Sequence, residues 1–389
     1  MTAFSWDSQP LGTVADLCLG KMLDQNKNRG DHLPYLANVN VRWGEFGLEN
    51  LRTMRFERKE ADRYGLKSGD IVMCEGGEPG RCAIWKNQVP GMMIQKALHR
   101  IRPKSLLDSS FLFYQFLHMG SLGKFDQFFT GATIKHLSGD KLAKVQVVVP
   151  PLPIQHRIAS ILSAYDDLIE NNRKRIAILE EMARRLYREW FFHFRYPGHE
   201  SVTFLDSPLG RIPQGWEPRR FGDVITLNYG KALKAEERMA GTIPVYGSSG
   251  VVGYHSESLV PGPGLIVGRK GNVGSLHWSD GPFYPIDTVF YATSTIFPLR
   301  FLLYSMAGMN FLNNDAAVPG LSRQQAYGLD VLVPDLGLLG QFCELAEPWG
   351  QLASNLARQS DVLRRTRDLL LPRLMSGQLS VEAAEAAIP

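Results

Sequence analysis

The sequence of 389 residues contains little cysteine, and this scarcity excludes two kinds of small-domain architecture. Its four cysteines, Cys18, Cys74, Cys82 and Cys343, are far apart and none belongs to a C-x-x-C pair. Neither a zinc ribbon nor a framework of disulfide bonds is therefore predicted. The first residues, MTAFSWDSQPLG, lack a basic segment followed by an apolar one, so no signal peptide is indicated. We expect a protein of the reducing cytoplasm.

Long apolar runs and a strong charge of one sign are also missing. The longest apolar patches, such as VQVVV at 145–149, have the length of a β-strand. They are far shorter than the roughly 18 apolar residues of a membrane span, so we expect no membrane association. The chain has 43 Lys and Arg against 39 Asp and Glu, and this net charge of +4 predicts no partner by itself. Its 44% hydrophobic and 21% charged residues are typical of a globular protein, and the length predicts two or three domains.

Catalytic and cofactor-binding motifs are absent. The glycine-rich stretches EGGEPG at 75–80 and GRKGNVG at 268–274 lack the G-K-[ST] ending of a P-loop and the spacing of a dinucleotide fold. The nine histidines form no H-E-x-x-H or H-x-E…C-x-x-C pattern. No nucleophile elbow, N-P-P-[FYW] methyltransferase motif or helicase box is present. We therefore expect a binding protein that has no catalytic residue, cofactor site or metal site of its own.

An internal repeat organises the chain. Leu11-Gly12 and Gly20-Lys21 recur 210 residues later as Phe221-Gly222 and Gly230-Lys231. The string FLFYQFLHM at 111–119 matches FLLYSMAGM at 301–309, and VQVVVP matches LDVLVP further on. The two glycine-rich stretches also align, with Gly77 and Gly80 matching Gly271 and Gly274, which favours a hairpin turn in both. The offset changes only in steps, as it does between duplicated domains with loops of different length.

Each copy begins with short apolar runs broken by Gly and Pro and ends with a long helical segment. The first part spans roughly 140 residues and is typical of β-rich structure. We predict an α+β fold with two β-rich domains in a pseudo-two-fold repeat, separated by two long antiparallel helices. The expected boundaries are 1–150 and 197–337 for the β-rich domains, with 151–196 and 338–389 for the helical segments.

Both helical segments carry an apolar seam. No Gly or Pro interrupts residues 154–196, and the apolar spacing averages near 3.5 residues, which is typical of a helix that faces a partner helix. In the second segment Pro348 and Gly350 predict a kink or break. The helices either pack against each other or pack separately on their own β-rich domains. The predicted seam residues are Ile161, Leu168, Ile176, Leu179, Leu186, Leu352, Leu356, Leu363 and Leu370.

Three sets of loops supply side chains suited to DNA, which needs cations for phosphates and forked or amide groups for base edges. The loops FFTGATIKHLSGDKLAK and NDAAVPGLSRQQAYG precede the last strand of each copy, and Ser138 and Ser322 in them are also candidate N-caps. The other sets are the glycine turns and the lysines that follow equivalent glycines. Any single tyrosine is equally explained by core packing, and any single lysine by solvation. The candidate DNA contacts are Lys21, Arg81, Thr133, Lys135, His136, Lys141, Lys144, Lys231, Tyr246, Arg269, Lys270, Ser322, Arg323, Gln324 and Gln325.

These segments resemble the DNA-specificity subunit of type I restriction–modification systems. The strongest similarity lies in VVVPPLPIQHRIASILSAYDDLIENNRKRIAILEEMARRLYREWFFHF at 147–194 and SPLGRIPQGWEPRRFGDV at 207–224. LLLPRLMSGQLS at 369–380 resembles the family's C-terminal end. GLIVGRKGNVGSLHW with YPIDTVFY, and GDIVMCEGGEPGRCAIW with IQKALHRIRP, resemble two types of its recognition domain. The resemblance covers nearly the whole chain.

The resemblance implies a non-catalytic subunit that binds double-stranded DNA at a split, asymmetric target, one half for each recognition domain. It also implies two modification subunits that carry S-adenosylmethionine and methylate adenine, and restriction subunits that translocate DNA with ATP and Mg²⁺. The two helices would then set the spacing between the half-sites. The alternative is a non-catalytic two-domain scaffold that binds a protein or a glycan. This alternative explains the missing catalytic motifs equally well, but it does not explain two equivalent basic loop sets on a duplicated frame.

Overall fold

The computed structural model describes residues 6–24, 28–131, 133–309, 311 and 320–386. The chain forms two compact units, which are Met1–Glu170 with Ser360–Pro389, and Asn171–Gln359. Both unit boundaries fall inside the long helices, so each unit contains a segment of both. The four segments expected from the sequence, two β-rich domains and two helical segments, remain a prediction. The two units do not correspond to these segments, because each unit combines a β-rich domain with parts of both long helices. No helix among the described residues combines the length and apolar character needed to cross a membrane.

The first unit is built on a four-stranded antiparallel sheet with the strand order β2-β8-β5-β6. Its strands are β2 (Ala15–Leu19), β8 (Leu98–Pro103), β5 (Ile71–Cys74) and β6 (Cys82–Ile84). A second sheet has the order β4-β3-β7, in which β7 joins β3 in parallel. Its strands are β4 (Arg52–Phe56), β3 (Asp31–Leu36) and β7 (Met93–Ile94). A short pair joins β1 (Ser8–Pro10) to β9 (Gln146–Val148).

Helices complete the first unit. They are α1 (Leu11–Val14), α2 (Ala61–Tyr64), α3 (Ser109–Ser121), α4 (Gly139–Leu142) and α10 (Val381–Glu385). Asp108 is the N-cap of α3, and its side chain accepts a hydrogen bond from the Phe111 N–H at 2.8 Å. Its apolar residues face β6 and β8 and join the main core of the unit. The sequence FLFYQFLHM therefore supplies the layer that covers the sheet.

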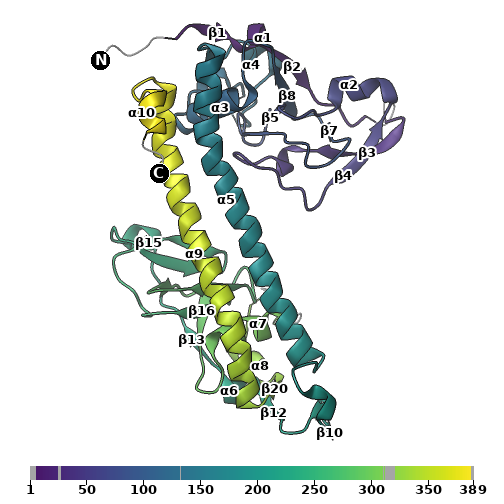
Figure 1. Cartoon of the computed structure of the whole chain (residues 1–389), viewed down its shortest axis with the longest axis vertical. Helices are drawn as coiled ribbons and strands as arrows, with labels where there is room; N and C mark the ends of the chain where they lie inside the picture. The colour runs from purple at the N-terminus through teal and green to yellow at the C-terminus, as the bar shows by residue number, and fades with distance from the viewer. Residues whose placement is uncertain (1–5, 25–27, 132, 310, 312–319, 387–389) are drawn as a thin grey trace. The chain divides into compact units, whose positions relative to one another are not determined.

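The second unit repeats this topology (Figure 1). Its four-stranded sheet has the order β13-β19-β16-β17, and its three-stranded sheet has the order β15-β14-β18 with β18 parallel to β14. The strands are β13 (Thr226–Tyr229), β19 (Val289–Thr293), β16 (Gly264–Gly268), β17 (Leu276–Ser279), β15 (Gly250–His255), β14 (Ile243–Gly247) and β18 (Tyr284–Pro285). A short pair again joins β12 (Glu217–Arg220) to β20 (Asp330–Val333), and the matching helices are α6 (Phe221–Val224), α7 (Leu299–Ala307) and α8 (Arg323–Tyr327).

The predicted duplication is confirmed down to single hydrogen bonds. Leu137 donates its N–H to the Glu75 carbonyl at 2.7 Å, and Leu321 donates to the Arg269 carbonyl at 2.8 Å. The turns after β5 and β16 also match, because Gly77 has a φ of 79° and Gly271, its counterpart, has a φ of 78°. A hairpin of β10 (Phe204–Ser207) and β11 (Gly210–Pro213) precedes the second copy.

The long helices are α5 (Leu152–Tyr187) and α9 (Leu336–Met375). In the first unit Ile158 and Leu162 join a core that includes Leu371 and Leu374, and in the second unit Ala183 shares a core with residues near the start of α9. These contacts bring opposite ends of the two sequences together, so the segments run antiparallel within each unit. The same cores contain residues of the sheets and of α3 or α7. The long helices therefore pack both against each other and on their β-rich domains.

Two residues predicted to lie in the helix seam, Leu168 and Leu352, are exposed, so their assignment to the seam is wrong. Leu168 is 49% exposed and Leu352 is 39% exposed, although the other seam residues are buried or half-buried. These two leucines are equivalent in the repeat, 184 residues apart. In α5 the half-buried residue beside Leu168 is Ile169, one position later. Asn172, one turn further along, is buried and donates a hydrogen bond to Gln359 at 3.1 Å. A spacing of 3.5 residues selected Leu168, whereas the residue that turns inward in the helix is Ile169, one position later.

A break in the second helix, one of the two outcomes predicted from Pro348 and Gly350, does not occur. The helix α9 continues through Pro348 and Gly350 without interruption. Gly350 has a packing role, because a Cβ there would lie 2.6 Å from the guanidinium carbon of Arg300. That guanidinium lies 3.8 Å from the centroid of the Trp278 ring and pairs with Glu347 at 3.4 Å. The glycine therefore admits a buried arginine.

The aromatic cluster WFFHF follows α5 and closes the core of the second unit. Trp190 and Phe191 are buried, and Phe191 contacts Phe301 at 5.0 Å and Phe342 at 5.2 Å between ring centroids. Phe192 points to solvent. The cluster is therefore mainly a plug within its own unit.

Candidate nucleic-acid interface

Four loops of the second unit meet beyond one end of its four-stranded sheet. The first follows β13 and carries Lys231, whose N–H binds the Pro285 carbonyl at 3.0 Å. The second follows β16, where the N–H groups of Arg269 and Lys270 both bind the Thr288 carbonyl. The third is the segment between β18 and β19, which supplies the Thr288 carbonyl. The fourth is the segment before α8, where the Leu321 N–H binds the Arg269 carbonyl of the second loop at 2.8 Å. Residues 314–319 of this predicted loop lie outside the described residues.

A tyrosine with two arginines occupies the centre of these loops. The guanidinium carbons of Arg269 and Arg323 each lie 4.9 Å from the ring centroid of Tyr229. Phe290 lies 4.9 Å from the same ring and closes it from the core side. Half of Tyr229 is exposed. Because an aromatic ring attracts a cation, Tyr229 holds both guanidinium groups together at the surface.

The two arginines differ in what they can reach. Arg269 is half-buried and donates to the Asp287 carbonyl at 3.1 Å, so part of its hydrogen-bonding capacity is used inside the unit. Arg323 is exposed and contacts Tyr229 and Tyr327 through its guanidinium face. Arg323 therefore keeps its forked edge open toward solvent.

The remaining candidates of this region are a half-buried serine and four exposed polar side chains. Ser322 caps α8 by accepting from the Gln325 N–H, as predicted. The capped helix directs the neighbouring positions outward. The exposed side chains are Lys231, Lys270, Gln324 and Gln325.

Tyr246 does not belong to this surface. It is 9% exposed, its hydroxyl donates to the Trp278 carbonyl at 3.2 Å, and its ring packs against Phe283. Burial raises the pKa of its phenol. The predicted DNA contact at Tyr246 is therefore wrong, and core packing explains this residue.

The predicted DNA contact at Lys21, the first-unit counterpart of Lys231, is also wrong. It is 3% exposed, and its ammonium donates to the Glu60 carboxylate at 2.5 Å and to the Arg55 carbonyl at 2.9 Å. The ring of Phe56 lies below it at 5.0 Å. The pKa of Glu60 is lowered, because the bonds from Lys21 and the Glu57 backbone outweigh the opposing effect of burial. Lys21 stabilises the fold and offers no free charge to a phosphate.

Arg81 is likewise directed into the first unit. Its guanidinium donates to the Glu78 carboxylate at 2.6 Å and to the Asn38 carbonyl at 2.9 Å. The second unit makes the equivalent bond with a smaller side chain, since the Ser275 hydroxyl donates to the Ser248 carbonyl at 2.6 Å. The predicted contact from Arg81 to DNA is therefore replaced by a role in holding the turn after β5.

Several of the predicted cationic contacts of the first unit lie on the loop before β9. Gly76 and Thr130 each form a bridge with His136, which fixes the loop beside the turn after β5. Lys135 lies 5.7 Å above the ring of Phe129. Ser138 stands at the N-cap of α4 but makes no capping hydrogen bond through its side chain, contrary to expectation. The predicted contacts that are exposed on this loop are Thr133, Lys135, His136, Lys141 and Lys144.

A buried histidine anchors this loop from below. The Nε2 of His99 lies 2.8 Å from the Leu137 carbonyl, and the ring is almost completely buried. Burial lowers the pKa of His99 against the smaller opposing effects of the Leu137 hydrogen bond and of Glu75. His99 is therefore a neutral support for the cationic loop near neutral pH.

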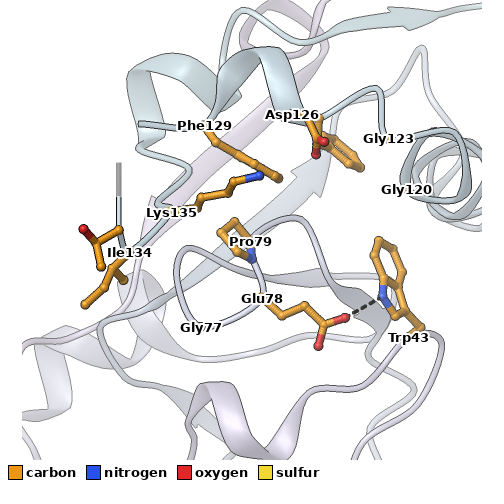
Figure 2. Close-up of a pocket in the computed structure, with 12 residues that line it drawn as sticks. Trp43, Gly77, Glu78, Pro79, Gly120, Gly123, Asp126, Phe129, Ile134 and Lys135 are labelled. Atoms are coloured by element: carbon orange, nitrogen blue, oxygen red, sulfur yellow. Dashed lines mark hydrogen bonds between the residues drawn. The ribbon is translucent and has the colours of Figure 1, made fainter. Parts of the chain in front are cut away.

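A hollow of about 640 Å³ opens between this loop and the turn after β5 (Figure 2). Trp43 stands on one side and donates its indole N–H to Glu78 at 3.1 Å, while Lys135 and Phe129 stand on the other. Asp126 also lines the hollow. The hollow thus combines aromatic faces with both signs of charge.

The sequence did not single out Tyr229, Trp43 or Glu78. Each becomes significant only through a partner distant in sequence, such as Arg323 for Tyr229 and Trp43 for Glu78. One signal was present in the sequence: the two copies of the repeat differ at this position, where the first has Leu19 and the second has Tyr229. No group of three or more potential metal ligands is assembled within the described part of the chain.

Comparison with known proteins assigns this fold to a family. Residues 5–181 and 213–325 match the family model described as type I restriction modification DNA specificity domain. The chain is similar to the type I restriction enzyme MjaIX specificity subunit of Methanocaldococcus jannaschii, with 26% identity over 83% of this chain and 81% of that protein. It is also similar to the MjaVIII specificity subunit of the same organism, with 26% identity over 60% of this chain and 52% of that protein.

A solved structure has the same fold. The crystal structure of the type I restriction–modification S subunit from M. genitalium superimposes with a TM-score of 0.60 at 18% identity. The match covers 95% of this chain and 96% of that chain. With the family model matching well over half of the residues, the chain belongs to the family of type I restriction–modification DNA specificity subunits, whose role is the recognition of a DNA sequence.

Proposed function

We propose that each unit reads one half of a bipartite, asymmetric DNA target. The observation that carries this proposal is a shared backbone frame with different side chains at its exposed positions. Tyr229 and Arg323 of the second unit correspond to Leu19 and Gly139 of the first. Because base edges are recognised by side chains, two units that differ at these positions select different bases.

In the second unit, Arg323 is the proposed reader of guanine. Its guanidinium is planar, exposed and fixed by Tyr229, which suits a two-pronged contact to the O6 and N7 atoms of guanine. Gln324 and Gln325 supply amides for adenine. Lys231 and Lys270 stand on the neighbouring loops and carry full charges, which suits phosphate contacts.

In the first unit, the proposed contacts lie on the loop before β9. Lys141 and Lys144 carry exposed charges for phosphates, while Thr133, Lys135 and His136 stand beside the hollow. The backbone bridges to His136 and the buried His99 hold this loop in place. A fixed loop loses less conformational entropy on binding, which favours selective recognition.

The chemistry of modification and restriction belongs to partner subunits in this proposal. Two modification subunits bring S-adenosylmethionine and methylate adenine, and restriction subunits bring ATP and Mg²⁺. The exposed apolar side chains of the long helices suit docking of such partners, because removing apolar surface from water favours association. In the first unit these are Leu168, Val362 and Leu369, and in the second unit Ile178, Met182, Leu336, Leu345 and Leu352. Since the proposed target is the DNA of the host cell, the proposed compartment is the cytoplasm.

Co-expression with the modification subunits tests the proposal. Single-molecule sequencing of the host DNA is expected to show methylated adenines in one split motif with unequal halves. The variant Arg323→Ala is expected to relax one half only, whereas Lys21→Arg, at a buried position, leaves the motif unchanged. A single continuous or palindromic motif contradicts the two-reader proposal. Absence of any methylation by an assembled complex favours the alternative, in which the units bind a protein or a glycan.

A further inference from the structure

The same turn carries different polar side chains in the two units. The stretch GGEPGR at 76–81 corresponds to KGNVGS at 270–275, so Glu78 and Asn272 occupy equivalent positions. Glycines with positive φ flank both, namely Gly77 and Gly80 in the first unit. The turn geometry is thus provided by glycine, and the residue between is free to vary without changing the backbone.

Glu78 is held in one orientation while its carboxylate stays open. One of its oxygens accepts from the Trp43 indole at 3.1 Å and the other from Arg81 at 2.6 Å. The side chain is nevertheless 54% exposed and faces the hollow (Figure 2). Each carboxylate oxygen has a second lone pair, so Glu78 retains acceptor capacity toward a ligand.

The surroundings of this carboxylate favour a base amino group over a phosphate as its ligand. Lys135 lines the same hollow, and the bridge between Gly76 and His136 places the turn directly beside the cationic loop. A carboxylate in such a surface repels phosphates, so it does not add to backbone affinity. It can accept a hydrogen bond from an amino group, and in the major groove cytosine N4 offers such a donor to Glu or Asp.

Asn272 has the complementary chemistry in the second unit. Its side chain is exposed, and the backbone bond from the Ser275 N–H to its carbonyl at 3.2 Å fixes the turn below it. Lys270 lies two residues earlier on the same loop. A side-chain amide can both donate and accept, which matches the N6 and N7 atoms of adenine.

We propose that Glu78 and Asn272 are equivalent specificity-determining residues, with Glu78 reading cytosine in one half-site and Asn272 reading adenine in the other. This inference rests on the proposed DNA-reading function of the two units. It adds a position that the two units share and assigns a base class to each side chain.

The experiment uses the full chain in complex with its modification subunits and maps methylated motifs for two variants. Glu78→Gln converts the acceptor into an amide and is expected to shift the preference at one base pair of one half-site from cytosine toward adenine. Asn272→Asp makes the reverse change and is expected to shift one base pair of the other half-site from adenine toward cytosine. A shift of about 10-fold or more is expected at each position, since a good base contact discriminates on that scale.

Co-purification with the modification subunits and thermal unfolding show whether each variant folds. If Glu78→Gln fails to assemble, Asn272→Asp decides the matter, because the Asn272 side chain is exposed and its replacement by a side chain of the same size disturbs the unit little. Unchanged motifs in the assembled variants overturn the inference, and so does an equal loss of methylation at all sequences. A wild-type complex without a split motif would instead contradict the proposed function itself, so the two failures are distinguishable.

Discussion

The guanidinium carbon of Arg323 lies 4.9 Å from the ring centroid of Tyr229, and these residues come from segments 94 positions apart. Arg269 lies at the same distance from the same ring. The tyrosine therefore fixes an exposed arginine that would otherwise sample many rotamers, and it does so in one unit only, because its counterpart is Leu19.

Replacing Tyr229 by leucine is expected to weaken discrimination in one half-site while leaving the other intact. An exposed cation–π contact contributes about 0.5–1 kcal/mol, so the expected loss in selective affinity is a few-fold. Tyr229→Phe keeps the ring and should retain most of the selectivity. The measurement is competition between cognate DNA and duplexes with single base changes. Equal behaviour of the leucine and phenylalanine variants would argue against a positioning role.

The equivalent lysines Lys21 and Lys231 are expected to respond in opposite ways to substitution by methionine. Lys21→Met removes the partner of the Glu60 carboxylate, so the free energy of unfolding should fall by about 2 kcal/mol. Lys231→Met should leave stability unchanged and reduce the slope of log affinity against log salt by about 1, as expected for one lost phosphate contact. Denaturant unfolding and DNA binding between about 50 and 200 mM salt check both. A reduced salt slope for a folded Lys21→Met protein would contradict the assignment of Lys21 to the core.

Two glycines of α9 provide a matched test of packing. At Gly350 an added Cβ meets the guanidinium of Arg300, which Trp278 and Glu347 hold in place, so Gly350→Ala should lower the free energy of unfolding by about 1–2 kcal/mol. At Gly340 a Cβ meets nothing within 4 Å, and alanine there should raise it by about 0.5–1 kcal/mol through helix propensity. Thermal unfolding of the full chain compares them. Stabilisation by both substitutions would show that Arg300 moves aside at little cost.

The duplication and the long helices were predictable because they leave regular traces in sequence. Glycines such as Gly77 and Gly271 recur at equivalent places since the turn requires a positive φ, and the apolar spacing of the helices survives whatever the loops contain. The limits of the pattern appear at Leu168 and Leu352. Positions one residue apart on a helix differ by about 100° in direction, and two neighbouring apolar residues compete for the inward one.

The charged residues were less predictable, because a charge is free or paired according to distant partners. Lys21 and Lys231 follow equivalent glycines, but Lys21 is buried against the Glu60 carboxylate whereas Lys231 is exposed. Similarly, Arg300 is buried through contacts with Trp278 and α9 that no local motif announces. Sequence equivalence therefore predicts backbone position well and side-chain availability poorly.

The stability of the first unit is expected to fall as the pH drops, because of His99. Burial holds its pKa below the ordinary value of 6.5, so the unfolded chain binds a proton more readily than the folded one. The neutral ring therefore contributes stability above about pH 6.5 that is lost as the pH falls from there toward the folded pKa. Thermal unfolding at about pH 7.5 and about pH 5.5 should show this loss.

His99→Phe, which introduces the residue found at the equivalent Phe290, should be less stable at the higher pH but less sensitive to acid. His118, whose pKa is also lowered by burial, provides the control variant His118→Gln, which should keep most of the pH dependence because its ring is only half-buried. An undiminished acid sensitivity in His99→Phe would mean that other groups, and not this buried imidazole under the cationic loop, determine the acid response.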